Sequence, residues 1–177
     1  MTKKSGISVR ETIVFAMLGA IMYCSKMLME FAPNIHFLGM FTMVFTIVYR
    51  KKALIPIYVC VFLVGMTYGF ALWWVPYLYL WTILWGVTML LPQNLPKKVA
   101  VPLYMVVCAL HGLTYGTLYA PFQALAFGMN FRQTIAWIVA GLPWDLVHAE
   151  GNLAAGTLIV PLSSVMIRIE KKIGSRP

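Results

Sequence analysis

Charged residues are scarce in this chain, and acidic residues are the scarcest of them. Only 11% of the 177 residues are charged, with five Asp and Glu in total, whereas 61% are hydrophobic. A soluble domain is typically about 45–50% apolar and about 25% charged. One domain of this length has too small an interior to hide so much apolar surface from water. We therefore expect lipid to solvate most of that surface.

The sequence also lacks the motifs of covalent and metal chemistry. Its three cysteines, Cys24, Cys60 and Cys108, lie inside apolar runs and form no CxxC pair, which favours buried small side chains over a disulfide or a metal site. There is no HExxH motif, no G-x-S-x-G elbow and no Walker A motif. We predict a chain that is not an enzyme, holds no cofactor or metal, and does not hydrolyse ATP by itself.

The net charge of +9 would suit a nucleic-acid-binding protein, but the positions of the charges indicate a membrane protein. If the long apolar runs of the sequence cross a membrane, Arg132 lies on one side of it and Lys26 lies near that side. Lys and Arg concentrate on the cytoplasmic side, so we expect both chain ends in the cytoplasm, an even number of spans and no nucleic-acid partner. The other side carries twelve of the fourteen basic residues: Lys3, Lys4, Arg10, Arg50, Lys51, Lys52, Lys97, Lys98, Arg168, Lys171, Lys172 and Arg176.

Six apolar runs come close to the length of a transmembrane helix, which is about 20 residues. They cover residues 12–29, 37–49, 53–74, 76–91, 99–127 and the later part of 131–169. Pro143 lacks a backbone donor, so we predict a short outer helix over 130–142 and a sixth span that opens at Pro143. The expected fold is one all-α domain over residues 1–177, an integral membrane bundle of six transmembrane helices.

Ionisable side chains inside the apolar runs are few, and such residues usually face a cavity or another helix. Lys26 and Glu30 lie one turn apart at the outer end of the first span, where a simple i,i+4 ion pair is the alternative to a binding role. Asp145, His148 and Asn152 lie on one stripe of the sixth span, at a depth similar to Lys26. We predict that the two regions meet across one outward-facing pocket.

Further candidates lie on the other spans and in the first outer loop. His111 and Tyr115 are one turn apart in the fifth span, where interhelical hydrogen bonding is the alternative. Aromatic residues crowd positions 73–81; an interfacial belt explains most of them, and one or two are expected to line the pocket. The predicted solute-binding residues are Lys26, Glu30, Asn34, His36, Trp74, Tyr77, Trp81, His111, Tyr115, Asp145, His148 and Asn152.

Small residues in the first span predict a close helix contact. Ala16 and Ala20 form a small-xxx-small pair with Gly19 beside them, and small residues let helices approach closely in lipid. With this pair, its length, its six predicted spans and the run PWDLVHAEGN, the chain resembles the substrate-binding S components of energy-coupling factor (ECF) transporters for vitamins and other micronutrients.

The resemblance implies partners and a mechanism. An S component captures a vitamin-like small molecule near the outer face of the membrane and topples on docking to the transmembrane T subunit. Two cytoplasmic ATPase subunits power the import. For this chain, the implied docking residues are Ala16, Gly19 and Ala20, and the implied location is the plasma membrane of a prokaryote, as a multi-pass protein.

Two other functions stay open at this point. The first alternative is a stand-alone carrier or channel for a small solute, for which the same small-residue face would serve as a dimer contact. The third hypothesis is a metal-dependent membrane enzyme that uses Asp145, His148 and His111, although zinc normally needs three or four protein ligands with tight geometry. The candidate residues fit many vitamins, so no single solute is predicted.

Overall fold

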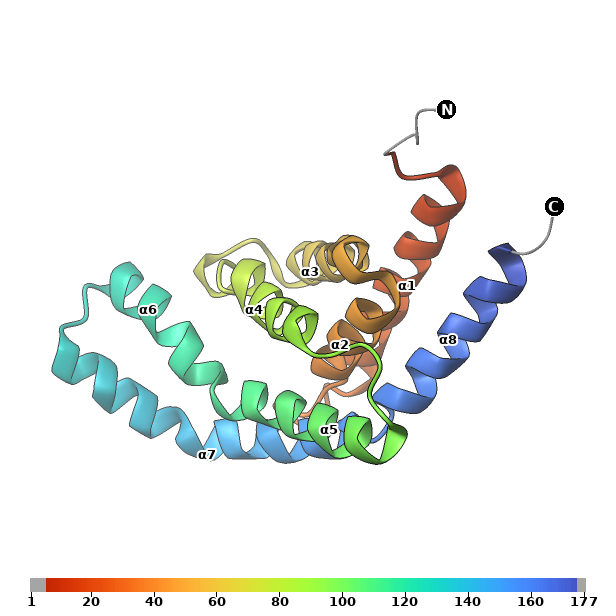
Figure 1. Ribbon diagram of the computed structural model, residues 1–177. Helices are drawn as coiled ribbons and strands as arrows, with labels where there is room; N and C mark the ends of the chain where they lie inside the picture. The colour runs from red at the N-terminus through yellow and green to blue at the C-terminus, as the bar shows by residue number, and fades with distance from the viewer. Residues whose placement is uncertain (1–5, 175–177) are drawn as a thin grey trace.

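The computed structural model describes residues 6–174, and this part of the chain contains helices and no strand (Figure 1). The predicted all-helical class is confirmed. Of the basic residues used to predict the orientation, Lys3, Lys4 and Arg176 fall outside the described residues. The helices are α1 (Val9–Leu28), α2 (Leu38–Tyr49), η1 (Arg50–Ala53), α3 (Leu54–Tyr68), η2 (Leu72–Trp74), α4 (Tyr77–Leu90), α5 (Lys97–Leu113), α6 (Tyr115–Phe127), α7 (Phe131–Gly156) and α8 (Ile159–Gly174).

Two helical segments within residues 6–174 are long and apolar enough to cross a membrane. They are α1 and the segment Lys97–Phe127, which joins α5 and α6 over 31 residues. The pair α7 and α8, bent by 46°, is a third if it counts as one span. Helices α2, α3 and α4 have 12, 15 and 14 residues, which is short of the roughly 20 that a span needs. The prediction of six full spans is therefore not confirmed.

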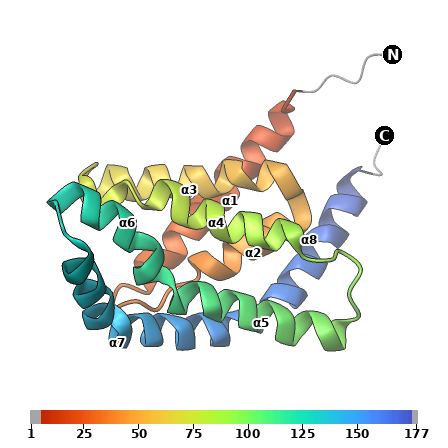
Figure 2. The same ribbon diagram turned by 60° about the vertical axis from the view of Figure 1, so that its left-hand side comes forward.

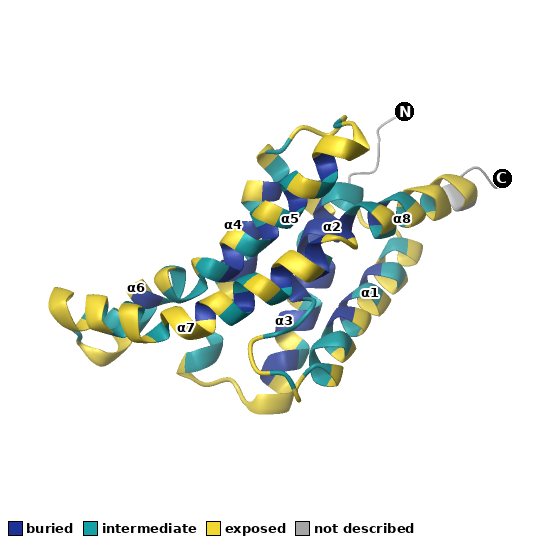
Figure 3. Cartoon of the chain, turned by 90° about the horizontal axis from the view of Figure 1, so that it is seen from below, coloured by how far each residue is buried: buried dark blue, intermediate teal, exposed yellow. Residues whose placement is uncertain are grey.

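Helix α2 is the core of the described chain. Leu38, Met43 and Phe45 are completely buried, and the dark blue of α2 in Figure 3 shows that most of its surface is covered. A helix that is apolar all round is stable only when other elements surround it. Here α1, α4, α5 and α8 pack around α2, which explains why so short a helix carries so many apolar residues.

Several helix boundaries differ from the sequence-based prediction. Helix α3 ends at Tyr68 because Gly69 has a φ of 86°, a left-handed conformation that glycine adopts at little cost. The predicted fifth span breaks at Thr114 into α5 and α6.

Pro143 does not open a helix as predicted, because it lies inside the continuous α7. The helix begins earlier, at a capping box in which the side chains of Asn130 and Gln133 each accept a hydrogen bond from the other residue's backbone N–H. Pro143 is exposed, so its ring and missing donor lie on the outer side of α7 while the inner side packs along α5.

Helix α1 begins and α8 ends at the same end of the molecule (Figure 2). Glu170 near the end of α8 joins the two, because its carboxylate pairs with Arg10 at 3.0 Å and accepts a hydrogen bond from the Tyr49 hydroxyl at 2.9 Å. We call this the basic end, defined by Arg10, Tyr49, Lys52 and Glu170.

The outer surface of the helices is strongly apolar. Met17 on α1 is 60% exposed, Val106 on α5 is 49% exposed and Leu146 on α7 is 53% exposed. The hairpin of α6 and residues 131–144 is the least buried region, and Ala120 is its one buried residue among those the structure describes. Tyr119 and Trp137 stack at 5.9 Å between ring centroids and hold the two arms of this hairpin together.

Helices α5 and α7 approach each other closely at Gly112. A Cβ atom at Gly112 would lie 2.9 Å from both Asn152 Nδ2 and the His148 carbonyl oxygen. Overpacking of this kind typically costs about 1–3 kcal/mol, so Gly112→Ala is expected to lower the free energy of unfolding, measured by denaturant titration in detergent. Gly141→Ala is the matched control, because nothing lies within 4 Å of its Cβ position. Equal losses in the two variants would contradict the close approach.

Candidate functional site

A pocket of about 230 Å³ opens where the loop 29–37 meets α4, α6 and α7. We call it the outer pocket. Seven of the twelve predicted solute-binding residues line it, so the structure brings the outer end of α1, the following loop and α7 together around one space. The lining residues are Lys26, Met29, Glu30, Ala32, Pro33, Asn34, Ile35, His36, Tyr77, Tyr115 and His148.

The loop 29–37 is folded over the side of α7. Asn34 has a φ of 60°, a conformation that Asn tolerates better than most residues, and the Ile35 N–H donates to the Ala32 carbonyl at 3.0 Å. Ile35 then packs against Gly151 of α7, where a Cβ would lie 3.2 Å from Ile35 Cγ2. The apolar wall residues Ala32, Pro33 and Ile35 were not predicted, and their only signal in the sequence is a position between Glu30 and His36.

Five aromatic and imidazole rings lie at the floor of the outer pocket. We call them the ring cluster: His36, Trp81, His111, Tyr115 and His148, which include all three histidines of the chain. The ring centroids of His148 lie 4.8 Å from His36 and 5.0 Å from Tyr115, and those of Trp81 lie 5.6 Å from His111 and 5.8 Å from His36. Trp81 and His111 do not line the pocket itself; they form the layer beneath it.

The ring cluster concentrates the unsatisfied hydrogen-bonding atoms of the described chain. Six buried side-chain nitrogen or oxygen atoms in the described residues lack a hydrogen-bond partner. Four of the six belong to the ring cluster: His36 Nδ1, Trp81 Nε1, His111 Nδ1 and His148 Nε2. A fifth is the Oδ1 atom of Asn152, next to the cluster. Each such atom costs about 1–3 kcal/mol, and native proteins leave few of them. Two of these atoms, His36 Nδ1 and His148 Nε2, belong to residues that line the outer pocket, and a polar ligand there would complete their hydrogen bonds.

His36 lies in the loop rather than in a helix. Burial lowers the pKa of His36 to about 4, and the positive charge of Lys26 acts in the same direction. At neutral pH the imidazole is therefore uncharged, with one nitrogen that donates and one that accepts. The wall of the outer pocket can thus offer either kind of hydrogen bond to a bound molecule.

Asn152 and Trp74 do not line the outer pocket. Asn152 is 1% exposed, and its Nδ2 donates to the Cys108 carbonyl at 3.1 Å, so it joins α7 to α5. Trp74 Nε1 donates to the Val61 carbonyl at 2.9 Å and packs beside Gly65. Each of the two side chains thus donates to a backbone carbonyl and joins two parts of the chain, and their role in solute contact stays a prediction.

Asp145 also has a structural partner in place of the predicted solute contact. Its carboxylate accepts the Gly116 N–H, at 3.1 Å from Oδ1 and 3.2 Å from Oδ2. Gly116 lies in the first turn of α6, where backbone N–H groups have no partner within the helix. Asp145 therefore acts on the outer pocket indirectly, by fixing the break between α5 and α6 and with it the direction of Tyr115.

Asp145→Ala is expected to destabilise the fold by about 1–3 kcal/mol, because it leaves the partly buried Gly116 N–H without an acceptor. Asp145→Asn keeps an acceptor oxygen and is expected to lose less. Denaturant titrations of both variants in detergent measure the difference. If Asp145→Asn were as damaging as Asp145→Ala, the negative charge rather than the hydrogen bond to Gly116 would be the important property.

The predicted docking residues on α1 do not share one face. Ala16 is exposed and Ala20 is half-buried, whereas Gly19 is buried against α3. A Cβ at Gly19 would lie 2.8 Å from the Pro56 carbonyl oxygen. Gly19 is therefore the point at which α1 approaches α3 of the same chain, and the docking role of the three residues stays a prediction.

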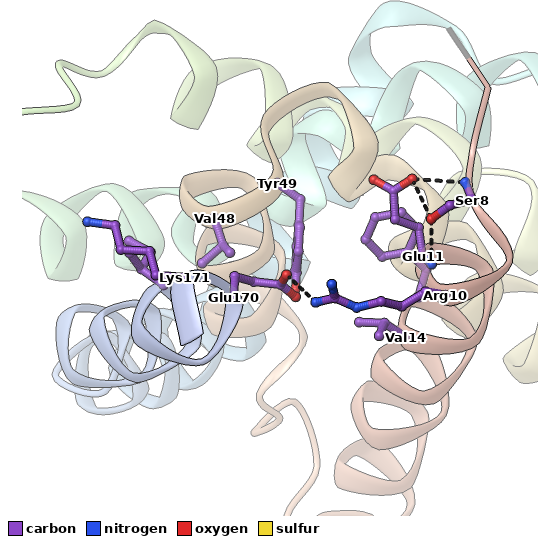
Figure 4. A pocket seen from close by; sticks show the side chains of 10 residues that line it. Ser8, Arg10, Glu11, Val14, Val48, Tyr49, Glu170 and Lys171 are labelled. Atoms are coloured by element: carbon purple, nitrogen blue, oxygen red, sulfur yellow. Dashed lines mark hydrogen bonds and ion pairs between the residues drawn. The ribbon is translucent and has the colours of Figure 1, made fainter. Parts of the chain in front are cut away.

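A larger pocket, of about 410 Å³, lies at the basic end between α1, α2 and α8 (Figure 4). Its carboxylates are already paired: Glu170 binds Arg10 and Tyr49, and Glu11 binds Ser8 and Lys52. None of the unpartnered buried atoms found in residues 6–174 lies there. We therefore take the smaller outer pocket as the candidate functional site.

The described residues contain no group of three or more His, Cys, Asp and Glu side chains placed to hold a metal ion. Comparison of the chain with family models, with curated proteins and with solved structures finds no match in any of the three.

Proposed function

We propose that this chain is a membrane-embedded solute-binding subunit that captures a small molecule from outside the cell in its outer pocket. The observation that carries the proposal is a pocket lined by His36 and His148, each with an unpartnered ring nitrogen, above the unpartnered nitrogens of Trp81 and His111. A buried polar cluster that only stabilises the fold normally satisfies its own hydrogen bonds. A ligand-binding pocket, in contrast, has a few convergent polar groups among apolar and aromatic walls.

A bilayer around the helices would explain the apolar outer surface. Isolated exposed apolar residues are ordinary, but large continuous patches on a monomer mark contact with a partner or a membrane. Met17, Val106 and Leu146 lie on three different helices, so the apolar surface extends around the molecule. Lipid covers such a surface on all sides at once, whereas one protein partner would cover a single face.

The depth of the pocket supports capture from the outer side. At 1.5 Å per residue, about 24 Å of α1 separates Arg10 at the basic end from Lys26. By the same rise, Cys108 lies about 16 Å along α5 from Lys97. Asn152 of α7 is hydrogen-bonded to Cys108, and His148 lies about 6 Å farther along α7 from Asn152. With the basic end in the cytoplasm, Lys26 at the far end of α1 and His148 beside it in the outer pocket lie away from the cytoplasmic side.

We further propose that the chain works as the S component of an ECF importer. On this proposal it crosses the plasma membrane of a prokaryote through six segments and binds a vitamin or related micronutrient. Docking on a T subunit with two ATPase subunits then drives import. The exposed Ala16 on α1, the position of the start of α1 and the end of α8 at one end of the molecule, and the outer pocket support this assignment.

Two measurements on the whole chain test the proposed function. Native mass spectrometry after mild detergent purification is expected to detect a retained small molecule. Uptake of that molecule by cells is expected to require both this chain and an ECF T–ATPase module. Uptake by the chain without the module would instead support a stand-alone carrier. The absence of both retained molecule and uptake would overturn the proposed function.

A further inference from the structure

The rim of the outer pocket carries one positive and one negative group side by side. Lys26 Nζ lies 3.8 Å from a Glu30 carboxylate oxygen, and both residues line the pocket. The other ion pairs found in residues 6–174 lie at the basic end. The Lys26–Glu30 pair is therefore the only pair of opposite charges that the described chain presents to the candidate site.

The pair is in contact but is not tightly hydrogen-bonded. Charge-assisted N–H···O bonds are usually about 2.7–2.9 Å long, well below the 3.8 Å seen here. Lys26 also lies over the ring of Tyr68, with Nζ 4.4 Å from the centroid, a cation–π contact that places the ammonium group at the pocket edge. Its side chain is 16% exposed and that of Glu30 is 46% exposed. Both charged groups thus keep hydrogen-bonding capacity for a ligand.

Below this charged rim the wall consists of rings. Tyr77, Tyr115, His36 and His148 line the pocket, and Trp81 lies behind them at 5.9 Å from Tyr77. Aromatic side chains on a pocket wall bind a ligand ring through stacked or edge-to-face contacts. The volume of about 230 Å³ is below the roughly 300–1,000 Å³ of drug-sized ligand sites. The space therefore suits a single small ring system rather than a nucleotide-sized molecule.

We infer that the solute of the outer pocket is an aromatic amino acid. An α-amino acid carries a carboxylate and an ammonium on one carbon atom, which matches a lysine and a glutamate one helical turn apart. Its carboxylate would bind Lys26, its ammonium would bind Glu30, and its ring would lie among Tyr77, Tyr115 and His148. A ring N–H, as in indole, would also supply a donor for the unpartnered His148 Nε2. This inference rests on the proposed solute-binding function.

The test measures binding of defined probes to the purified full chain by isothermal titration calorimetry in mild detergent. L-Tryptophan, L-tyrosine and L-phenylalanine are the candidate solutes. Tryptamine lacks the carboxylate, indole-3-propionate lacks the amine, and L-alanine lacks the ring. At least one aromatic amino acid is expected to bind, and the analogues that lack one group are expected to bind at least about tenfold more weakly, because each leaves a partly buried charge unpaired.

Two charge-removing variants assign the charged groups. Lys26→Gln removes the proposed partner of the carboxylate and is expected to reduce the preference for tryptophan over tryptamine. Glu30→Gln removes the proposed partner of the ammonium and is expected to reduce the preference for tryptophan over indole-3-propionate. Glu150→Gln is the matched control, since Glu150 is an exposed residue of α7 that does not line the pocket, and it is expected to change neither preference. Elution of each variant as wild type on size exclusion confirms that it is folded.

The outcomes separate this inference from the proposed function. Equal affinity for tryptophan, tryptamine and indole-3-propionate would overturn the inference, as would unchanged preferences in Lys26→Gln and Glu30→Gln. Failure of all three aromatic amino acids to bind, while mass spectrometry finds a different retained molecule, would overturn the inference and leave the proposed function standing. Failure to bind with no retained molecule and no uptake would overturn both.

Discussion

His148→Leu is expected to lower the affinity of the chain for its solute by about 30- to 150-fold. His148 lines the outer pocket, lies against both His36 and Tyr115, and has an unpartnered Nε2 atom. Losing a buried hydrogen bond to a ligand costs about 2–3 kcal/mol where a partner is left unsatisfied, which gives this range of affinities. Leucine keeps most of the side-chain volume, so the helix packing is expected to survive.

The matched control for this prediction is Glu150→Leu. This variant also changes a polar residue to leucine, two positions after His148 and on the exposed side of α7. It is expected to leave the affinity unchanged. Isothermal titration calorimetry with the molecule retained on purification measures both variants. Similar affinity losses in the two would show that α7 was disturbed as a whole. Unchanged affinity in His148→Leu would remove His148 from the site.

Ala16→Trp is expected to reduce solute uptake by cells to background while solute binding to the purified chain stays unchanged. Ala16 is exposed on α1, so a large ring there meets a docking partner rather than the core of this chain. About 15 Å of helix separates Ala16 from Lys26 at 1.5 Å per residue, which keeps the substitution away from the outer pocket. Uptake of labelled solute, at matched expression, measures the effect.

Val106→Trp is the control for the docking prediction. Val106 is 49% exposed on α5. The substitution therefore adds the same ring to another apolar face and is expected to leave uptake intact. Ala20→Trp is a poorer probe, because Ala20 is half-buried and a large ring there would also disturb the packing of α1. Normal uptake in Ala16→Trp would show that partner docking does not use this face of α1.

Helix content and the approximate positions of the helices were readable from the sequence, because long apolar runs between charged clusters leave few alternatives to a helix. The first run, 12–29, corresponds closely to α1. The breaks inside longer runs were harder to place. The end of α3 falls at Gly69, which adopts a φ of 86°, whereas α7 runs through Pro143 without a break. A glycine or proline in the sequence marks a position where a helix can end, but it does not decide whether the helix ends there.

The candidate site was predictable in its membership and less so in the role of each residue. Lys26, Glu30 and His148 were selected because polar groups in apolar runs usually face a cavity, and the structure places all three on one pocket. Asp145 was selected by the same reasoning, yet its carboxylate binds a backbone N–H 29 residues away in the chain. Periodicity assigns a residue to a face of its helix, but it does not identify the atom that the side chain meets there.

The unequal burial of α7 has a consequence for local opening of the chain. The second half of α7 is held to α5 by the hydrogen bond of Asn152 and by the close approach at Gly112 of α5. In contrast, few residues of α6 and of the segment 131–144 are buried. Amide hydrogens in the hairpin should therefore exchange with deuterium well before those of residues 148–156, since opening the hairpin uncovers little apolar surface. The chain would then open first at the α6–α7 hairpin, while residues 148–156 stay packed against α5.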